Sequence, residues 1–512
     1  MKKLFYTSTL FLCVLFTHAQ DGTLDLSFDT DGLVNHALYT LPTTEKANAI
    51  AVQPDGKIVV AGYAFTGVDD DFLVARYNHN GSLDLTFGGT GSITTDFSNS
   101  EDIAYDVIVQ PDGKIVVAGY TVVTAPNKFA LARYNADGSL DATFGTGGKL
   151  VTAFATSSIA FALALQPDGK IVAVGQHTPG SSESAIVRYN TDGSLDNTFD
   201  LDGKLNLTYY PGSIEIPSDV VIQTDGKIVV SSEHWNSSGT LELGLMRLNP
   251  SGSLDLTFDS DGVATMSIAS SPGTSPWGMC LQSDGKLAVT GYVMIGGMNK
   301  IFVARFNTNG SADPTFGTGG YTITTVNTYF NIGTSIVQQS DGKLLIGAHL
   351  QNALGDDFGV LRYQTNGNLD LSFGSAGYSF IDFGSYDDCF DIALQPDGKI
   401  VTTGWMHNGS DEDVGVARLH NLGTTTMAVA EQDDISYSIY PNPVSNLLVV
   451  TLEKPVANAC LKLVDATGKI VLQKQNMNGS HLTLDLSDQV PGIYFLELSN
   501  GDQRLCKKLI KQ

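Results

Sequence analysis

Three aspartates recur at one position of a repeated unit and could work as an acid and a base. Asp106, Asp219 and Asp391 each lie near the start of the first strand expected in their copy. A pair of carboxylates about a glycosidic bond is the machinery of glycosidases, and a carboxylate base also serves lyases. Short polar side chains also cap strand ends and turns. We take capping as the main interpretation and catalysis by these residues as the alternative.

Aromatic residues outside the repeated anchors form a second candidate site. Flat rings flanked by carboxylates suit sugars, which stack on a ring face and donate hydroxyl protons to oxygen acceptors. The alternative is that these rings pack beneath long loops. The rings expected after the second strand of a unit or before the first are Trp235, Trp277, Trp405, Tyr209, Tyr210 and Tyr386. Carboxylates in the same segments are Asp69, Asp70, Asp71, Asp356, Asp357, Asp411, Glu412 and Asp413.

Two further sets could hold a metal ion. Carboxylates two residues apart beside a glycine are typical of calcium loops, and Phe-Asp-x-Asp-Gly occurs three times, at Asp29 and Asp31, Asp200 and Asp202, and Asp259 and Asp261. Other copies place Gly-Thr-Gly-Gly or a similar turn there, so we expect these aspartates to make turns. His177, His234 and His349 are interpreted as one equivalent position. We expect no histidine metal site, because strands away from the axis would hold them apart. No cofactor is predicted.

Composition and missing motifs narrow the function. The sequence contains no Gly-x-Ser-x-Gly elbow, His-Glu-x-x-His, phosphate loop or dinucleotide fingerprint. It has 54 acidic and 29 basic residues among 512, for a net charge of −25, so a nucleic-acid partner is disfavoured. No apolar run reaches the ~20 residues of a transmembrane helix.

A unit of about 57 residues must position these candidates, since two anchors recur seven times each. The glycine of Gln-x-Asp-Gly-Lys falls at Gly56, Gly113, Gly169, Gly226, Gly285, Gly342 and Gly398. The aspartate of Gly-x-x-Asp-x-(Thr/Ser)-Phe falls at Asp25, Asp84, Asp141, Asp196, Asp255, Asp313 and Asp370. One arginine per copy accompanies them, at Arg76, Arg133, Arg188, Arg247, Arg305, Arg362 and Arg418. A single active site does not need seven copies, so we expect one structural Arg–Asp contact in each unit.

The sequence of each unit predicts four short antiparallel strands joined by tight turns. A unit of this length is the size of one propeller blade. In the second copy the expected strands are residues 104–110, 114–120 and 129–135, with a fourth beginning after Gly91 or Gly148. The chain starts with only a last strand, residues 32–36, and the seventh unit stops after its third. Joining the two fragments would close the ring and hide its edges. We therefore predict an all-β, seven-bladed β-propeller over residues 20–423, with the N-terminal strand closing the last blade.

The recurring Gln-Pro-Asp-Gly-Lys-Ile-Val-Val-Ala-Gly and Gly-Ser-Leu-Asp-x-Thr-Phe-Gly resemble the delta-60 repeats of bacterial secreted β-propellers. The likeness covers roughly residues 21–423 in register. Thr224, Ser283 and Ser340 replace the turn proline, and Pro314 breaks the second motif in one copy. The resemblance implies a propeller and brings no established activity.

Both ends of the chain differ in sequence from the repeats between them. Lys2 and Lys3, an apolar stretch and Ala19 fit a secretory signal peptide over residues 1–19. After a linker at residues 424–434, residues 435–512 predict a small β-sandwich, with strands that include residues 447–452, 460–464 and 493–498. The motifs there resemble the type A sorting domain of type IX secretion and comprise Tyr440, Pro441, Asn442, Pro443, Gly492, Tyr494, Lys507 and Lys508. The resemblance implies a Bacteroidetes-type bacterium, recognition by the type IX machinery, and a product secreted or attached to the outer-membrane surface.

These observations give a ranked set of functions. Residues 435–512 hold eight basic and six acidic residues, and the signal has two lysines, so 19 basic and 48 acidic residues remain elsewhere. The acidity therefore lies outside the tail. We expect a secreted or cell-surface binding module for carbohydrate or a surface partner. A polysaccharide hydrolase or lyase and a purely structural envelope protein are the alternatives. Whether Cys460 and Cys506 pair is left open.

Overall fold

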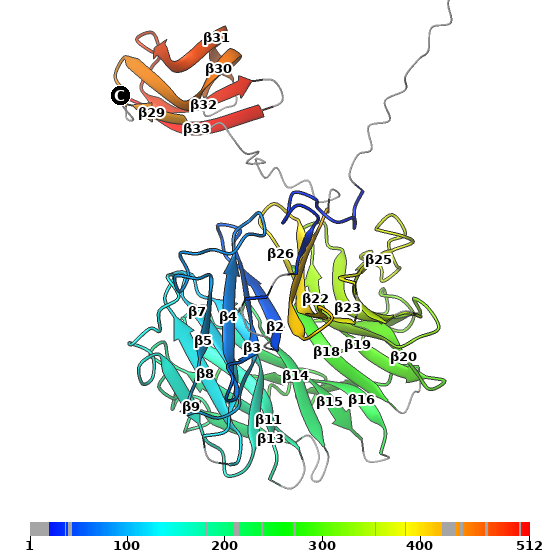
Figure 1. Ribbon diagram of the computed structural model, residues 1–512. Helices are drawn as coiled ribbons and strands as arrows, with labels where there is room; N and C mark the ends of the chain where they lie inside the picture. Colours follow the sequence, from blue (N-terminus) through cyan, green and yellow to red (C-terminus); the bar gives the residue numbers. More distant parts are fainter. Residues whose placement is uncertain are drawn as a thin grey trace, which may run out of the picture. The chain divides into compact units, whose positions relative to one another are not determined.

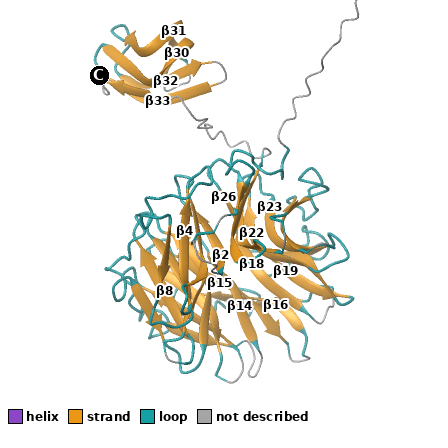
Figure 2. Ribbon diagram, viewed as in Figure 1, coloured by secondary structure: helices purple, strands orange, loops and turns teal. Residues whose placement is uncertain are grey.

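The computed structural model describes residues 20–35, 37–38, 44–123, 125–179, 182–208, 214–236, 239–269, 273–353, 355–384, 386–421, 437–440, 444–465, 469–500 and 503–512. It separates into two compact units, Met1–Thr426 and Met427–Gln512. The described residues of both units form strands, turns and loops, without a helix (Figure 2). Within that part of the chain, nothing has the length and apolarity of a membrane-crossing helix.

The first unit consists of seven four-stranded antiparallel sheets, the blades, arranged around an axis (Figure 1). Blade 1 consists of β2 (Glu45–Val52), β3 (Ile58–Phe65), β4 (Asp70–Tyr77) and β5 (Ser92–Thr95). Blade 2 consists of β6 (Asp102–Val109), β7 (Ile115–Thr121), β8 (Lys128–Tyr134) and β9 (Lys149–Thr152). Blade 3 consists of β10 (Ser158–Leu165), β11 (Ile171–His177), β12 (Glu183–Tyr189) and β13 (Lys204–Leu207). Blades 4 and 5 are β14 (Glu215–Ile222), β15 (Ile228–Trp235), β16 (Leu241–Leu248) and β17 (Val263–Met266); β18 (Thr274–Leu281), β19 (Leu287–Ile295), β20 (Met298–Phe306) and β21 (Tyr321–Thr324). Blades 6 and 7 are β22 (Asn331–Gln338), β23 (Leu344–Gln351), β24 (Asp356–Tyr363) and β25 (Tyr378–Ile381); β26 (Asp387–Leu394), β27 (Ile400–His407), β28 (Glu412–Leu419) and β1 (Leu33–Val34).

The N-terminal strand closes the ring, as the sequence predicts. Strand β1 pairs antiparallel with β28, so that Leu33 lies opposite Ala417. The first strand of each blade contacts the first strand of the next, and β26 contacts β2 to complete the circle. These first strands are therefore the innermost. Closure leaves no pair of open ends, which an open solenoid would have to cap.

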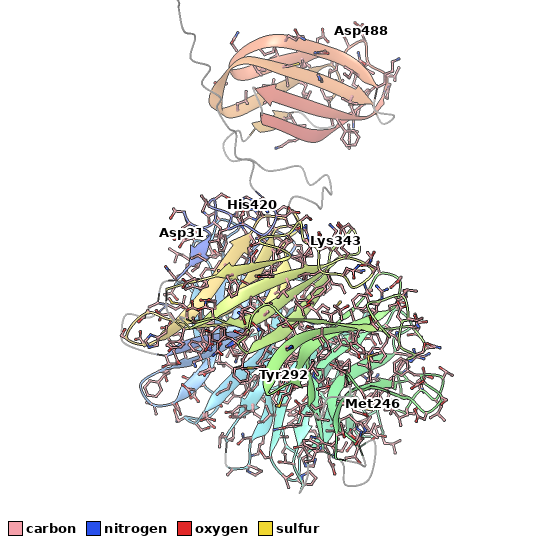
Figure 3. All side chains as sticks on the ribbon, turned by 90° about the vertical axis from the view of Figure 1, so that its right-hand side faces the viewer. Asp31, Met246, Tyr292, Lys343, His420 and Asp488 are labelled. Atoms are coloured by element: carbon pink, nitrogen blue, oxygen red, sulfur yellow. The ribbon has the colours of Figure 1, made fainter. Side chains whose placement is uncertain are left out.

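Tight turns set the register of every blade. In blade 2 the Gln110 amide donates to the Lys114 carbonyl at 2.8 Å, and Gly113 takes the left-handed conformation at φ 84°. This hairpin and the turn after the third strand lie at one end of the blades, here called the turn face. The opposite end, where the inner strands begin, is the mouth face. Figure 3 draws Lys343 and His420 at one edge of the propeller and Tyr292 away from it.

At the turn face, one arginine per blade links its own blade to the next. The Arg133 Nε donates to Asp141 Oδ2 at 2.8 Å, and its Nη1 donates to the Thr191 carbonyl of the next blade at 2.5 Å. The guanidinium also lies 4.5 Å from the ring centroid of Phe144. Burial alone would raise the pKa of Asp141, but Thr143, Lys114 and Arg133 hold it well below its usual range.

The same Arg–Asp contact occurs in all seven blades, as expected. The pairs are Arg76–Asp84, Arg133–Asp141, Arg188–Asp196, Arg247–Asp255, Arg305–Asp313, Arg362–Asp370 and Arg418–Asp25. The last pair joins the two ends of the propeller chain across the closing blade. The distance from Arg418 Nε to Asp25 Oδ2 is 2.9 Å, so the contact that other blades make internally also helps to close the ring.

Apolar side chains fill the spaces between neighbouring blades. One core cluster takes Val59 and Phe72 from blade 1 and Val107 and Val117 from blade 2. Each blade thus buries both of its faces against neighbours, which explains why the second and third strands read as nearly continuous apolar runs.

Each inner strand carries a β-bulge at the same place. In blade 2 the register shifts between Ala104 and Asp106, so Tyr105 is the extra residue. A bulge leaves its extra residue outside the regular ladder and re-aims its side chain. The seven bulge residues are Asn48, Tyr105, Phe161, Ser218, Trp277, Thr334 and Phe390.

The C-terminal unit is a five-stranded antiparallel sheet. Its strands are β29 (Tyr437–Tyr440), β30 (Leu447–Asp465), β31 (Ile470–Asp485), β32 (Gly492–Asn500) and β33 (Gln503–Lys511). Residues 447–452 and 460–464, expected as two strands, belong to the single irregular strand β30, whose register with β31 shifts at several points. Buried Leu448, Leu461, Leu496 and other apolar residues form its core.

The strand order of this unit separates the two cysteines of the tail. Cys460 pairs with Ser499, and Cys506 pairs with Glu497, so β32 lies between them. Two strand spacings amount to about 10 Å, beyond the ~7 Å limit between Cα atoms of a disulfide. The register therefore argues against a disulfide between Cys460 and Cys506.

Candidate functional site

Aromatic side chains lie on the inner and second strands of blades 7, 1, 2 and 3, in the half of the strands nearer the mouth face. The Tyr105 ring stacks on Tyr120 with centroids 6.2 Å apart and meets the edge of Phe161 of the next blade at 5.4 Å. On the other side, Lys46 Nζ lies 4.2 Å from the centroid of Trp405. Lys46 is directly opposite Tyr63 in the ladder. We call these five rings the mouth arc.

The rings of the mouth arc come from two repeated positions. Tyr105 and Phe161 are bulge residues of inner strands, and Trp277 of blade 5 holds the same position. Tyr63, Tyr120 and Trp405 lie opposite the second residue of an inner strand. All are partly exposed except Tyr120, which is buried.

Carboxylates surround the arc. The Tyr120 hydroxyl donates to Glu101 Oε1, and Lys46 pairs with Glu412 Oε1 at 3.0 Å. Burial raises the pKa of Tyr63 to about 12, and the negative charges of Asp70 and Glu412 add to the shift. The arc therefore offers ring faces beside hydrogen-bond acceptors, and Lys46 lies against one of the rings. That combination can stack a sugar ring and accept its hydroxyl protons.

The predicted aromatic candidates fall into three groups. Trp405 belongs to the mouth arc, and Trp277 is 38 % exposed on the inner strand β18. Trp235 is also 38 % exposed, but it ends β15 at the hairpin tip, and no ring contact joins it to the others among the described residues. Tyr386 is exposed just before β26. All three tryptophans lie in strands, where loop positions were expected. Tyr209 and Tyr210 lie outside the described residues.

The three aspartates proposed as acid and base link neighbouring inner strands. Asp106 Oδ2 accepts the Leu163 amide of the next blade at 2.6 Å, and its Oδ1 accepts the Val107 amide at 2.7 Å. Asp219 receives the Met279 amide at 2.7 Å, and Asp391 receives the Ile50 amide at 2.8 Å. Both oxygens of each carboxylate are engaged with backbone. This arrangement is structural, and catalysis by these three stays a prediction.

Burial raises the pKa of these carboxyl groups, to about 7 for Asp219 and about 6 for Asp391. The pKa of Asp106 is also raised, by burial first and then by the charges of the other two. Mutual repulsion of like charges on the inner strands explains this second contribution.

The Asp-x-Asp pairs serve as turns. Asp29, Asp200 and Asp259 take positive φ angles of 44°, 43° and 45°. Asp31 Oδ1 accepts the Leu33 amide at 2.9 Å, and Asp202 and Asp261 accept the corresponding amides. The first aspartate of each pair tolerates this backbone conformation, and the side chain of the second caps the turn. None of the six belongs to a group of converging ligand atoms within the described residues.

The three histidines do not share one position. His177 and His234 lie opposite the first residue of an inner strand, whereas His349 lies opposite the second, Ile332. Side chains alternate along a strand, so His349 points to the other side of its sheet. Its Nδ1 contacts Asp388, and its Nε2 lies 3.4 Å from Asp356. Burial would lower the pKa of His349, but these two carboxylates raise it, which favours an imidazolium ion pair.

Sorting-motif residues are described only in part. Tyr494 is buried in the tail core, and its hydroxyl donates to the Val490 carbonyl at 2.8 Å. Gly492 begins β32, and the Lys507 side chain is exposed. Pro441, Asn442 and Pro443 and the side chains of Tyr440 and Lys508 lie outside the described residues.

Comparison with protein families agrees with this architecture. A "Domain of unknown function (DUF5122) beta-propeller" model matches residues 53–87, 110–144, 166–199, 223–258, 282–316, 339–373 and 395–425. The chain is a DUF5122 β-propeller protein. A "Secretion system C-terminal sorting domain" model matches residues 438–512. This DUF5122 protein is therefore exported by type IX secretion, to the cell surface or the medium, and its tail engages that machinery.

Solved structures share parts of the propeller at low identity. A protein of unknown function from Dyadobacter fermentans DSM 18053 is 10 % identical with a TM-score of 0.42, covering 76 % of this chain and 99 % of its own. The polysaccharide lyase Uly1 is 11 % identical with a TM-score of 0.44, over 73 % and 90 %. An alpha-L-arabinanase of Penicillium chrysogenum is 12 % identical with a TM-score of 0.40, over 71 % and 97 %. TM-scores this low do not bear on the ligand of the DUF5122 protein. No curated protein sequence matches the chain.

Proposed function

We propose that the DUF5122 propeller is a secreted or cell-surface binding module that holds carbohydrate at the mouth of its channel. The mouth arc carries this proposal. Tyr105, Tyr120 and Phe161 form one contiguous aromatic surface across two blades. Glu101 and Glu412 stand beside it as hydrogen-bond acceptors.

The charge near the mouth arc limits the class of sugar that is expected to bind there. Among the described charged side chains with a printed interaction to the arc, Glu101, Asp70 and Glu412 are acidic, and Lys46 is basic but already paired with Glu412. A polyanionic glycan would meet net repulsion there, whereas neutral or amino sugars would not. Neutral and cationic glycans are therefore the expected ligands.

Binding of purified chain to a glycan array tests the proposal. We expect signals on neutral or amino-sugar glycans. Tyr105→Ala should weaken the best of them by about tenfold, corresponding to ~1.4 kcal/mol of stacking and burial. Trp235→Ala is the control, because this ring is exposed and lies outside the arc. No binding on the array, or equal losses from the two variants, would contradict the proposal.

A further inference from the structure

Three carboxylates converge at the junction between blades 1 and 2. Asp71 lies in β4, Asp96 follows β5, and Asp102 begins the inner strand β6. One oxygen from each lies within 4.8 Å of the others. Asp71 is 6 % exposed and Asp102 is fully buried, while Asp96 is exposed. Bringing three like charges together away from water is costly without a counter-charge.

The same arrangement occurs between blades 6 and 7. Asp357 takes the place of Asp71, Asp382 follows β25, and Asp387 begins β26. Their oxygens also lie within 4.8 Å of one another, and Asp387 is fully buried. The chain therefore builds the cluster twice, from equivalent positions of its repeat.

Three buried oxygens of these clusters have no hydrogen-bond partner among the described residues. Asp102 Oδ2 accepts the Phe97 amide at 2.6 Å, but its Oδ1 has no hydrogen-bond partner among the described residues. The same holds for Asp71 Oδ1 and for Asp387 Oδ1. No lysine or arginine forms a side-chain ion pair with the six carboxylates among the described residues. The cations nearby are Lys149, whose Nζ donates to the backbone carbonyl of Asp96 at 2.9 Å, and His349, whose charge acts on Asp357.

The propeller fold does not require carboxylates at these positions. The residue equivalent to Asp102 is neutral and fully buried at three junctions: Ser158 between blades 2 and 3, Thr274 between blades 4 and 5, and Asn331 between blades 5 and 6. At the other two junctions it is buried Glu45 or Glu215, and neither belongs to a converging group of carboxylates among the described residues. A neutral residue thus fits the same space, so the acidic clusters are a feature of two junctions and not of the scaffold.

We propose that each cluster is a divalent-cation site with a preference for Ca²⁺. Three carboxylates supply hard oxygen ligands from three separate segments, and the exposed Asp96 or Asp382 leaves room for water to complete the coordination. Ca²⁺ accepts six to eight oxygens in irregular geometry, whereas Mg²⁺ demands a near-ideal octahedron. A bound cation would join the third strand of one blade to the inner strand of the next.

Calorimetric titration of the full chain with CaCl₂ after chelator treatment tests the sites. We expect about two ions per chain, with dissociation constants near the 10⁻⁴–10⁻³ M of extracellular calcium modules. Asp102→Asn and Asp387→Asn reproduce the amide of Asn331, and each should reduce the stoichiometry to about one. Asp192→Asn, at an exposed turn, is the matched control and should leave it unchanged.

Thermal melting provides a second readout. CaCl₂ should raise the melting temperature of the wild-type propeller, and the double variant Asp102→Asn, Asp387→Asn should lose that rise. In chelator the double variant should melt no lower than wild type, because carboxylate repulsion is relieved. If that variant fails to fold, exposed Asp96→Asn with Asp382→Asn replaces it. No calcium binding by the wild type, or undiminished binding by the variants, would overturn the proposal.

Discussion

At the residue scale, the repeated arginine is a stability element. Arg247 is buried, donates to Asp255 at 2.7 Å and reaches the Thr308 carbonyl of the next blade at 2.5 Å. Removing one partner of a buried ion pair leaves an uncompensated charge. Lys227 lies 3.1 Å from Asp255 and offsets part of that loss.

Arg247→Ala should therefore destabilise the propeller by about 2–3 kcal/mol. Its melting temperature by differential scanning calorimetry measures the effect. Lys300→Ala, at a side chain without an ion pair among the described residues, should change it little. Equal melting temperatures for Arg247→Ala and wild type would show that the pair does not stabilise the ring.

The inner aspartates predict a pH dependence. Asp219 faces Asp106, Asp391 and Cys280 across the inner strands, and burial raises its pKa to about 7. A carboxyl group whose pKa is higher in the folded state binds its proton more tightly there. Its stabilising contribution is thus complete at low pH and is lost as the pH rises through about 7.

The melting temperature should therefore fall between pH 5 and pH 8 in chelator, and Asp219→Asn should reduce that fall by the equivalent of about 1–2 kcal/mol. Thermal scans at both pH values, with the exposed Asp192→Asn variant as control, provide the comparison. The interpretation fails if Asp219→Asn shows the same slope as wild type.

At the element scale, the N-terminal strand closes the ring by completing the last blade. Strand β1 pairs with β28, and Asp25 pairs with Arg418. Deleting residues 20–35 should leave the edge of β28 open and Arg418 buried without its carboxylate. We expect a lower melting temperature and self-association through the open edge.

Size-exclusion chromatography and calorimetry of this deletion provide the measurement. Removing the separate unit at residues 427–512 serves as the control and should leave the propeller transition in place. A monomeric deletion variant with the wild-type transition would mean that closure by β1 is dispensable.

Sequence periodicity predicted the blades because each turn has its own chemistry. Gly113 adopts the left-handed conformation that the hairpin requires, and the strands of blade 2 begin and end within about two residues of expectation. The Arg–Asp contact also followed from regular spacing. The tail was harder, since the register shifts within β30 carry one strand through two predicted ones.

The candidate site was predicted less well because it depends on bulges. Tyr105, Phe161 and Trp277 share a bulge position that an alignment of the seven copies could have revealed. The direction of these side chains depends on the register shift of the bulge. No turn residue common to the seven copies marks that shift in the sequence, so the sequence alone did not predict it. A one-residue misalignment likewise placed His349 with His177. Convergence of Asp71 with Asp102 requires the packing of one blade on the next.

At the scale of the whole molecule, one acidic propeller is joined to a sorting domain. Outside the tail and the two signal lysines the chain has 48 acidic and 19 basic residues. Export by type IX secretion takes this propeller to the cell surface or beyond. A strongly acidic exported ring repels polyanions and leaves neutral or cationic ligands and cations as its partners.

Hydrogen–deuterium exchange of the chain, with and without the best-bound glycan, tests the central claim most directly by locating the ligand. We predict added protection at the mouth face, in β2, β6 and β10 around the bulges and at the ends of β3 and β7. Turn-face hairpins such as residues 110–114 should exchange unchanged. Protection confined to the turn face or to residues 437–512, with none at the mouth, would contradict the account.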